Sequence, residues 1–482
     1  MTDVAVVGAG PNGLAAAVTL ARAGLSVQLF EAADSIGGGT RTAELTLPGF
    51  RHDVCAAVHP MALASPFFKA FELGRRIELL VPEISYGHPL NGGRAGIAYR
   101  DLERTVEGLG ADGPAWRALM KPLLRRLDGV VDFTQGSLLR IPKDPLAVLD
   151  YGLRTLAQGT PAWNVAFKED VAPAMLTGVA AHAIGRLPSL ATSGAGMLLG
   201  ALAHAQGWPV PRGGSQAIAQ AMAEDLLAHC GRIDVSHRVD SVAELKHATG
   251  AQAVICDVTP RALASMARNE LPVRYMRQLE SFKYGPGVCK VDFALSGPVP
   301  WTATELRNAP TVHLGGTRAA IAFAENEVLA GRHPANPYVL AVQAGVIDDS
   351  RAPSGQHTFW AYTHVPSGSA RDCTEDIIRI VEKHAPGFRD LILASNTQTA
   401  QDVGNYNANY IGGDISSGAV TMAQLLKRPV FSPDPWRTPS DGLYLGSAST
   451  PPGPAVHGMA GWLAAKSALK NTFGLPAPAL GL

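Results

Sequence analysis

The 482-residue chain has no excess of charge of either sign, because 41 Lys and Arg balance 41 Asp and Glu. Charged residues make up only 17% of the chain and aromatic residues only 6%, whereas hydrophobic residues reach 46%. A disordered chain would be rich in charge and poor in aliphatic residues, so this composition predicts folded domains. It also argues against a nucleic-acid-binding protein that relies on bulk positive charge, since there is no cationic excess to displace counterions.

Cysteine is scarce and scattered along the chain. The five cysteines are Cys55, Cys230, Cys256, Cys289 and Cys373. None of them forms a CxxC pair, which argues against a dithiol redox centre, a disulfide framework and a zinc site. We therefore read them as free thiols and expect no metal site.

Long apolar runs are missing as well. No 18 apolar residues follow one another, so a membrane-spanning helix is not expected. The start, MTDVAVVGAG, has neither a basic region nor a cleavable apolar segment, which predicts a cytoplasmic protein. The nearest approach to an apolar run is 171–208, rich in Ala, Leu, Met and Gly. We favour a buried helical pair lining a cavity there, with an apolar tunnel wall or a patch resting on a membrane as alternatives.

What the chain does have is a glycine-rich turn between two strand patterns. Asp3–Val7 is a short apolar run, Gly8–Gly13 reads G-A-G-P-N-G, and Leu14–Ala23 is helical in character. Leu25–Phe30 then alternates as a second strand and ends at Glu31. This order predicts a βαβ unit.

The glycines and the acid of this unit have separate roles in binding a dinucleotide. Gly8 permits the tight turn, Gly10 lets the backbone approach a pyrophosphate, and Gly13 lets helix and strand pack closely. The helix N-terminus offers N–H groups to the phosphates. Glu31 is placed to accept hydrogen bonds from a ribose diol, and its charge would repel the 2′-phosphate of NADP.

A second glycine cluster follows Glu31. The sequence Gly37-Gly38-Gly39-Thr40-Arg41 can bring further backbone close to the dinucleotide. The Arg41 guanidinium could contact a phosphate through two parallel hydrogen bonds.

The rest of the chain predicts both helices and strands. Residues 100–205 look mostly helical, and further helices are predicted at Gln216–His229, at Thr374–Lys383 with Thr374 as its cap, and from about Val456 to Asn471. The predicted strands are Ile233–Val235, Val239–Val242, Ala253–Cys256, Lys290–Leu295, Thr311–Leu314, Tyr338–Gln343, Thr358–His364 and Gly442–Gly446.

Several motifs together resemble one family. They are V-V-G-A-G-P-N-G-L at 6–14, L-F-E at 29–31, the G-G-x-x-R-T-type motif at 37–42, P-R-G-G-S-Q-A-I at 211–218, and L-Y-L-G-S-A-S-T-P-P-G-P-A-V-H-G at 443–458. The chain resembles the phytoene desaturase-like flavoprotein oxidoreductases, within the wider group that includes amine oxidases. A-V-H-P at 57–60, V-I-C-D-V-T-P-R at 254–261 and N-Y-I-G-G-D at 409–414 resemble the branch of pyridine nucleotide-disulfide oxidoreductase domain-containing proteins.

The resemblance implies an α/β fold and FAD as the cofactor. It implies a Rossmann-like FAD-binding domain of the glutathione reductase/amine oxidase type, with an inserted α+β substrate domain that is largely helical and carries an antiparallel sheet. We expect the FAD-binding domain in three parts, 1–75, 205–260 and 430–482. The substrate domain would then comprise 76–204 and 261–429.

The motifs and the resemblance together assign residues to FAD. They are Gly8, Gly10, Pro11, Asn12, Gly13, Glu31, Ala32, Gly38, Gly39, Thr40, Arg41, Val239, Gly446, Ser447, Val456, His457, Gly458 and Met459. In the family, the residue matching Glu31 holds the adenosine ribose and the backbone near Val239 meets the adenine. The terminal helix near His457 points its N-terminus at the flavin pyrimidine edge. The chain departs from the family at Pro454-Ala455, where relatives more often carry glycines.

Four side chains are candidates for catalysis: His59, His457, Asp414 and Tyr410. The two histidines lie in motifs expected near the flavin, and Asp414 follows two glycines and could act as a base or a cation anchor. Tyr410, with Tyr406, could line the pocket like the aromatic cage of amine oxidases. For each of the four a structural role is the alternative, such as a hydrogen-bonded core histidine or an Asx turn.

We therefore expect an FAD-dependent oxidoreductase that dehydrogenates or desaturates an apolar small molecule. A hydride would pass from a substrate carbon to flavin N5, followed by loss of a proton. No second GxGxxG follows a strand, so reoxidation by O2 or a quinone-like acceptor is expected rather than by a nicotinamide. Amine oxidase-like oxidation, flavin-dependent isomerisation and a non-catalytic flavin-binding scaffold stay as alternatives. The expected partner is the small apolar substrate and not nucleic acid; a peripheral membrane contact and a homodimer stay open.

Overall fold

Five short parallel strands form the first sheet, and they come from three separate parts of the chain. The computed structural model describes residues 2–482. The strand order is β16 (Leu443–Leu445), β10 (Ala253–Cys256), β1 (Val4–Val7), β2 (Val27–Phe30) and β9 (Arg232–Asp234). Because the strands are parallel, the carboxyl ends of β1 and β2 meet at one edge, where Gly8 and Glu31 follow.

Helices cover both faces of this first sheet, as parallel sheets require. On one face, α1 (Pro11–Arg22) packs between α10 (Gln216–Ala228) and α18 (Met459–Ala468). The other face is covered by α11 (Val242–Thr249), α12 (Pro260–Met266) and α13 (Val273–Glu280). Successive side chains of each strand point into opposite cores, so the strands read as continuous apolar runs.

The second sheet has seven mostly antiparallel strands. Their order is β15 (Ile392–Gln398), β11 (Gly287–Leu295), β14 (His357–Val365), β13 (Val339–Val342), β12 (Thr311–Leu314), β6 (Ile84–Pro89) and β7 (Ala95–Tyr99). The pair β12 and β6 is parallel. Helix α15 (Thr374–Glu382) shares a buried apolar core with one face of the sheet, while α14 (Arg318–Leu329) and α8 (Val171–Ala181) share another core with β13 and β14.

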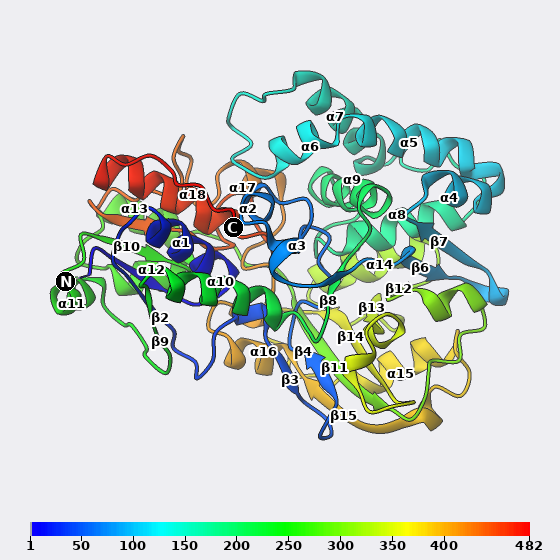
Figure 1. The fold of residues 1–482 in the computed structure, drawn as a ribbon. Coiled ribbons are helices and arrows are strands. Elements are labelled where there is room, and N and C mark those ends of the chain that lie inside the picture. Colours follow the sequence, from blue (N-terminus) through cyan, green and yellow to red (C-terminus); the bar gives the residue numbers. More distant parts are fainter. Residues whose placement is uncertain (1) are drawn as a thin grey trace.

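A block of helices lies beside this sheet, at the upper right of Figure 1. Its members are α4 (Leu102–Gly108), α5 (Gly113–Arg125), α6 (Leu127–Thr134), α7 (Pro145–Gly159), α8 and α9 (Leu190–Ala205). Helix α9 lies at the centre and contacts α5, α7 and α8. The remaining short elements include β3 (Thr42–Glu44), β4 (Arg51–Asp53), α2 (Pro66–Ala70), α3 (Leu73–Arg76), α16 (Ala400–Tyr406) and α17 (Met422–Leu426).

Most of the elements predicted from the sequence are present. The βαβ unit, the helices near 216–229 and 374–383, and seven of the eight further predicted strands are confirmed. The terminal helix begins at Met459, three residues later than predicted, and is continued by a π-helical segment, Leu469–Phe473. Segment 171–208 forms the pair α8 and α9, whose side chains are mostly buried, so it does not form a membrane-facing patch.

Two local predictions are wrong, and both concern residues at the start of a helix. Val239–Val242 is not a strand, because Ser241 accepts a hydrogen bond from the Glu244 N–H (3.2 Å) and starts α11 instead. Thr374 does not cap α15 either. The N-cap is Cys373, and the Thr374 hydroxyl donates to Asp372 (2.6 Å).

Over residues 2–482, no helix combines the length and the apolar character that crossing a bilayer would need.

We call the five-stranded sheet with its covering helices the first lobe, and the seven-stranded sheet with the helical block the second lobe. A buried arginine, Arg351, joins the two lobes. Arg351 donates to Asp348 (Nε–Oδ2, 2.7 Å) and to Asp53 at the end of β4 (Nη2–Oδ2, 2.9 Å). The same two carboxylates accept the N–H groups of Gly213 and Ser215, each at 2.8 Å. The three charged side chains are at most 2% exposed. The P-R-G-G-S loop at 211–215, strand β4 and the second lobe are thus held by one charge cluster.

Replacing Arg351 by Met should destabilise the protein strongly. The change would leave the buried Asp53 without its counter-charge and Asp348 with only the partly exposed Arg212, 3.9 Å away. Removing one partner of a buried ion pair typically costs about 3–5 kcal/mol of unfolding free energy. Urea denaturation followed by circular dichroism measures this loss. Arg332→Met is the control, since Arg332 forms an exposed pair with Glu327 and should change little. A loss for Arg351→Met no larger than that of the control would contradict the role of this cluster.

Candidate functional site

One large cavity lies where the two lobes meet. Its volume is about 1010 Å³, at the upper end of the range common for small-molecule and cofactor sites. Its wall takes residues from the carboxyl edge of the first sheet, from the helical block, from strands β12 to β14 and from the segment 405–456. The cavity thus connects the expected dinucleotide site with the second lobe.

The turn between β1 and α1 forms one end of the cavity. Gly8 has a φ of +100°, and a Cβ at Gly13 would lie 1.9 Å from the Gly8 carbonyl oxygen. Only glycine satisfies both positions. Gly8, Gly10, Pro11 and Asn12 line the cavity, so the N-terminus of α1 faces it. This is the arrangement in which a helix N-terminus binds phosphate.

Glu31 lies in the cavity wall at the carboxyl end of β2. Its Oε2 accepts the N–H of Ala9 (2.8 Å), and its Oε1 accepts the N–H of Ala33 (2.9 Å). These two bonds fix the carboxylate beside the glycine turn. Val239 and Arg238 line the same end of the cavity.

Arg41 is largely occupied by the protein itself. Its Nη2 donates to the Ser35 carbonyl (2.5 Å), and its Nη1 donates to the Tyr406 hydroxyl (3.0 Å). Its Nε is directed at the Ser35 and Ile36 carbonyls. Its Nη2 also lies 3.5 Å from Glu31 Oε1, so of the five N–H groups of the guanidinium only the second one on Nη1 has no partner within the described residues. The two-bond phosphate contact expected from the sequence stays a prediction.

Asp257, which the sequence analysis did not single out, lies at the same helix N-terminus. Its Oδ2 accepts the Gly13 N–H (2.9 Å) and lies beside Gly10. Burial above all, and the negative charge of Glu31 to a smaller extent, raise the pKa of this carboxyl to about 7, against the lowering effect of the Gly13 N–H. The sequence signals were its position directly after a buried parallel strand and its place in the motif V-I-C-D-V-T-P-R at 254–261.

The residues assigned to FAD divide into two groups. Those that line the cavity are Gly8, Gly10, Pro11, Asn12, Glu31, Ala32, Gly38, Gly39, Arg41, Val239, Ser447 and Val456. Those that lie behind it are Gly13, Thr40, Gly446, His457, Gly458 and Met459. The second group packs the framework: a Cβ at Gly446 would lie 2.9 Å from the Ala464 Cβ. Thr40 stabilises the second glycine turn, since its hydroxyl donates to the Gly37 carbonyl (2.7 Å).

His59 lines the cavity, and one of its ring nitrogens is buried with no hydrogen-bond partner within the described residues. The Ser215 hydroxyl donates its one hydrogen to the Ala56 carbonyl (2.6 Å), so His59 Nε2, 2.7 Å from Ser215 Oγ, must be the donor in that contact. Nδ1 is therefore an acceptor, and it is buried and without a partner within the described residues. Burial lowers the pKa of His59 to about 4, so the ring is neutral at pH 7.

The other three candidates differ in their access to the cavity. Tyr410 lines it, and its hydroxyl lies next to Gly39. His457 does not: its Nε2 contacts the Gly453 carbonyl (3.1 Å) and its Nδ1 accepts the Met459 N–H (3.0 Å). Asp414 is also outside the lining, and its carboxylate accepts the N–H groups of Gly285, Ser416 and Gly418 at 2.7–2.8 Å. The geometry of His457 and Asp414 argues for backbone capping instead of proton transfer.

The far end of the cavity is apolar. Its wall includes Phe133, Leu138, Val148, Tyr151, Leu156, Ile184, Leu190, Leu198, Leu199, Leu340, Val342, Trp360, Tyr362, Val420, Met422, Leu425 and Leu426. Residues of α9 and of the turn 182–184 contribute to this wall, whereas α8 itself contributes none, so of the predicted cavity-lining pair only α9 is confirmed.

Two buried polar pairs near this end escaped the sequence analysis. His182 lines the cavity, and its Nε2 contacts Nε2 of His313 behind it at 2.7 Å. Lys290 pairs with Asp292, and it lies in one cross-strand row with Tyr362, Leu340 and His313. A lysine and an aspartate two residues apart in an otherwise apolar strand were the signal for the second pair. Nothing in the sequence joined the two histidines.

The cavity wall fits a flavin dinucleotide. Asn12 Oδ1, His59 Nδ1 and Trp360 Nε1 are buried polar atoms of lining residues with no partner in the described part of the chain. Such atoms normally find a partner, so a bound molecule with polar groups is expected to supply one. With the glycine turn and Glu31, they form a site suited to FAD. Across residues 2–482, no group of three His, Cys, Asp or Glu side chains could hold a metal ion.

Residues 6–71 match the NAD(P)-binding Rossmann-like domain family. The chain is also 25% identical to the pyridine nucleotide-disulfide oxidoreductase domain-containing protein 2 of Rattus norvegicus. That alignment spans 537 residues and covers 95% of this chain and 92% of the relative. A shorter alignment of 110 residues, 34% identical, is with one chain of the limonene dehydrogenase of Castellaniella defragrans and covers 22% of this protein and 19% of that chain.

Among solved structures, cyclohexylamine oxidase from Brevibacterium oxydans is similar with a TM-score of 0.59 and 16% identity, covering 98% of both chains. These comparisons confirm the fold class and the resemblance expected from the sequence. The chain therefore has the mixed α/β fold of amine oxidase-type FAD oxidoreductases, with a Rossmann-like dinucleotide-binding domain, and is similar over its length to the pyridine nucleotide-disulfide oxidoreductase domain-containing proteins 2.

Proposed function

We propose that this protein is an FAD-dependent oxidoreductase that dehydrogenates or desaturates an apolar small molecule and is reoxidised by O2 or a quinone-like acceptor. The observation that carries the proposal is the distribution of charge along the cavity. Within residues 2–482, the charged side chains that line it are Glu31, Asp257, Arg41 and Arg238. All four belong to the glycine-turn end, so the far end offers a substrate only apolar contacts and a few neutral polar groups.

The cofactor would be held by the lining residues at the charged end. Gly8, Gly10 and the N-terminus of α1 are suited to the diphosphate, and Glu31 to the adenosine ribose. When bound, FAD supplies the acceptor for a hydride from the substrate carbon. The chain's own residues bind the substrate, keep water out of the apolar end and accept hydrogen bonds.

His59 is the residue that we propose for proton handling. Its Nδ1 is an acceptor held in place by the Nε2 contact with Ser215. It can accept a hydrogen bond or a proton from the bound substrate or cofactor. Tyr410, which also lines the cavity, is proposed to shape the site near Gly39.

Oxidation of an amine is the second candidate. Trp360 and Tyr362 line the cavity with ring centroids 5.0 Å apart, and Tyr410 lines it too, an aromatic set that suits a neutral amine. A charged amine would need a carboxylate, and the lining of the apolar end provides none within the described residues. The names of the similar proteins point both ways, since one acts on limonene and another on cyclohexylamine.

An anaerobic titration of the FAD-loaded protein tests the proposal. Limonene, a ring hydrocarbon, and cyclohexylamine, a ring amine, serve as the two probes, alongside a lipophilic polyene. We expect the visible flavin absorbance to bleach with one or more of the hydrocarbons and not with the amine. Bleaching by cyclohexylamine alone would establish the second candidate, and a flavin that no probe reduces would favour a scaffold without turnover.

Asp257 should make FAD binding depend on pH. Below its pKa of about 7 the carboxyl group is neutral, whereas above this pH its negative charge would repel the diphosphate. The dissociation constant for FAD should therefore rise between pH 6 and 8, by up to about tenfold per pH unit above the pKa. Fluorescence titration of the apoprotein at several pH values measures it.

In the Asp257→Asn variant this pH dependence should be lost, because the side chain stays neutral. Asp128→Asn, whose side chain is 95% exposed, is the matched control and should behave like the wild type. A variant at Asp257 that keeps the full pH dependence would show that this carboxyl group does not act on the diphosphate.

A further inference from the structure

Helix α7 exposes an apolar face to the solvent. Leu146, Leu149, Leu153 and Leu156 are 53%, 57%, 53% and 49% exposed. Their spacing of three, four and three residues places them on one side of the helix. The helix contains only two charged residues, Asp150 and Arg154, and these pair with each other at 3.2 Å. We call these four leucines the α7 face.

The opposite side of α7 packs against the protein and lines the cavity. Ala147 and Gln158 are buried, and Val148, Tyr151 and Thr155 line the cavity. The helix is therefore packed on one side, and its exposed leucines are not needed to attach it to the protein. An ordinary surface helix carries charged or polar residues at such positions.

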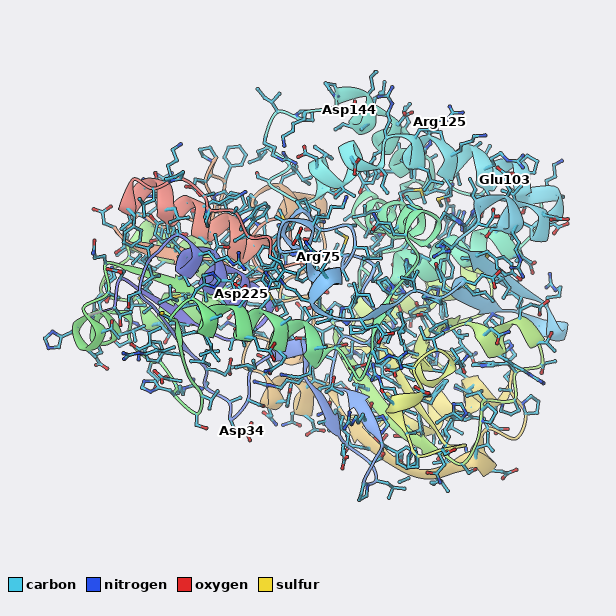
Figure 2. The ribbon with its side chains drawn as sticks, viewed as in Figure 1. Asp34, Arg75, Glu103, Arg125, Asp144 and Asp225 are labelled. Atoms are coloured by element: carbon cyan, nitrogen blue, oxygen red, sulfur yellow. The ribbon has the colours of Figure 1, made fainter. Side chains whose placement is uncertain are left out.

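Segments next to α7 in the chain, and helix α17, expose further apolar side chains. Leu139 (40%) and Ile141 (91%) precede the helix, and Val165 (85%) follows it. From α17, Met422 (37%) and Leu426 (41%) are exposed, and both α7 and α17 contact α9. In Figures 1 and 2 the start of α7, marked by its N-cap residue Asp144, lies at the upper edge of the molecule.

This surface is continuous with the mouth of the cavity. Leu156, Met422 and Leu426 are exposed to the solvent and also line the cavity. An apolar molecule that moves from this surface into the cavity would therefore contact apolar side chains at the mouth and then at the apolar end of the cavity.

The charge around the α7 face points to an anionic partner. Residues 113–159, from the start of α5 to the end of α7, contain seven Lys and Arg, four Asp and no Glu. The whole chain, in contrast, has equal numbers of both signs. Lys143 beside Ile141 is 81% exposed but pairs with Asp132 at 3.2 Å, whereas Lys427 next to Leu426 and Lys121 of α5 are exposed with no ion-pair partner in the described part of the chain. Apolar side chains with a fringe of lysines are the composition of surfaces that bind the interface of anionic membranes.

We propose that the α7 face docks on a lipid bilayer that contains anionic phospholipids, with the mouth of the cavity at the membrane surface. A second copy of the chain fits this surface less well, because a two-fold contact would place the same net-positive segment against itself. The docking rests on the surface alone. Entry of an apolar substrate from the bilayer into the cavity rests on the function proposed above.

Sedimentation with vesicles tests the docking on the full-length, FAD-loaded protein. We expect the wild type to sediment with vesicles of phosphatidylcholine and phosphatidylglycerol at 7:3, and less with phosphatidylcholine alone or at high salt. The double variant Leu149→Glu/Leu153→Glu should reduce the vesicle partition coefficient by at least about tenfold. Its FAD content and melting temperature, measured without vesicles, should match the wild type, which shows that the variant is folded.

The matched control is Leu227→Glu/Phe323→Glu, two large apolar residues that are 54% and 64% exposed on α10 and α14. It should bind vesicles like the wild type. Wild type that stays in the supernatant, or an α7 variant that binds as well as the control, would overturn the proposal. So would a vesicle-free dimer, measured by light scattering, that the α7 variant abolishes. The readout is protein mass in the pellet, so a failed anaerobic titration would leave the docking result intact.

Discussion

The packing of helix α1 against strand β1 is the constraint on which the cofactor end of the molecule depends. A Cβ at Gly13 would lie 1.9 Å from the Gly8 oxygen, and one at Gly461 would lie 1.7 Å from the Asn12 oxygen. Because glycine permits both approaches, α1 lies between β1 and α18 with its N-terminus at the cavity. Glu31 then faces the same space from the adjacent strand, and Asp257 reaches the helix from the strand on the other side. A larger side chain at either glycine would move the helix away from all of these groups.

The second lobe completes the cavity and makes one end of it apolar, in contrast to the charged end at the glycine turn. The Arg351 cluster fixes this lobe to β4 and to the loop at 213–215, and His59 is held by Ser215 from the same loop. Charged groups therefore gather where a dinucleotide would bind, while the helical block supplies the apolar wall. Apolar side chains also lie on the exposed side of α7, so the apolar cavity wall and the apolar outer surface share this helix.

Short-range features of the fold could be predicted from the sequence, and long-range pairs could not. The turn at Gly8–Gly13 and the acid at Glu31 depend on neighbours within a few residues or on one strand pairing, so the local pattern was sufficient. Asp257 and His182 act through partners distant in the chain, as Arg351 does through Asp53, and no pattern along the sequence joins them. Lys290 and Asp292 are two residues apart, so their spacing was visible, but their burial was not. Asp414 and His457 were plausible bases by motif alone, yet their side chains are occupied by nearby backbone N–H and carbonyl groups. The apolar segment 171–208 is covered by its neighbours, whereas the exposed leucines belong to α7. Hydrophobic periodicity could not show which apolar helix side is buried and which is exposed, since both sides of α7 are apolar.

The binding of FAD at the glycine turn and Glu31 is the central claim, and the flavin content of the purified protein tests it most directly. Protein saturated with FAD, freed of unbound cofactor and then denatured should release about one FAD per chain, measured by chromatography with fluorescence detection. The Glu31→Arg variant cannot accept hydrogen bonds from the ribose, so it should lose most of this FAD, while Glu280→Arg, an exposed site on α13, should retain it. A wild type that releases no FAD, or a Glu31→Arg variant that retains as much as the wild type, would contradict the account.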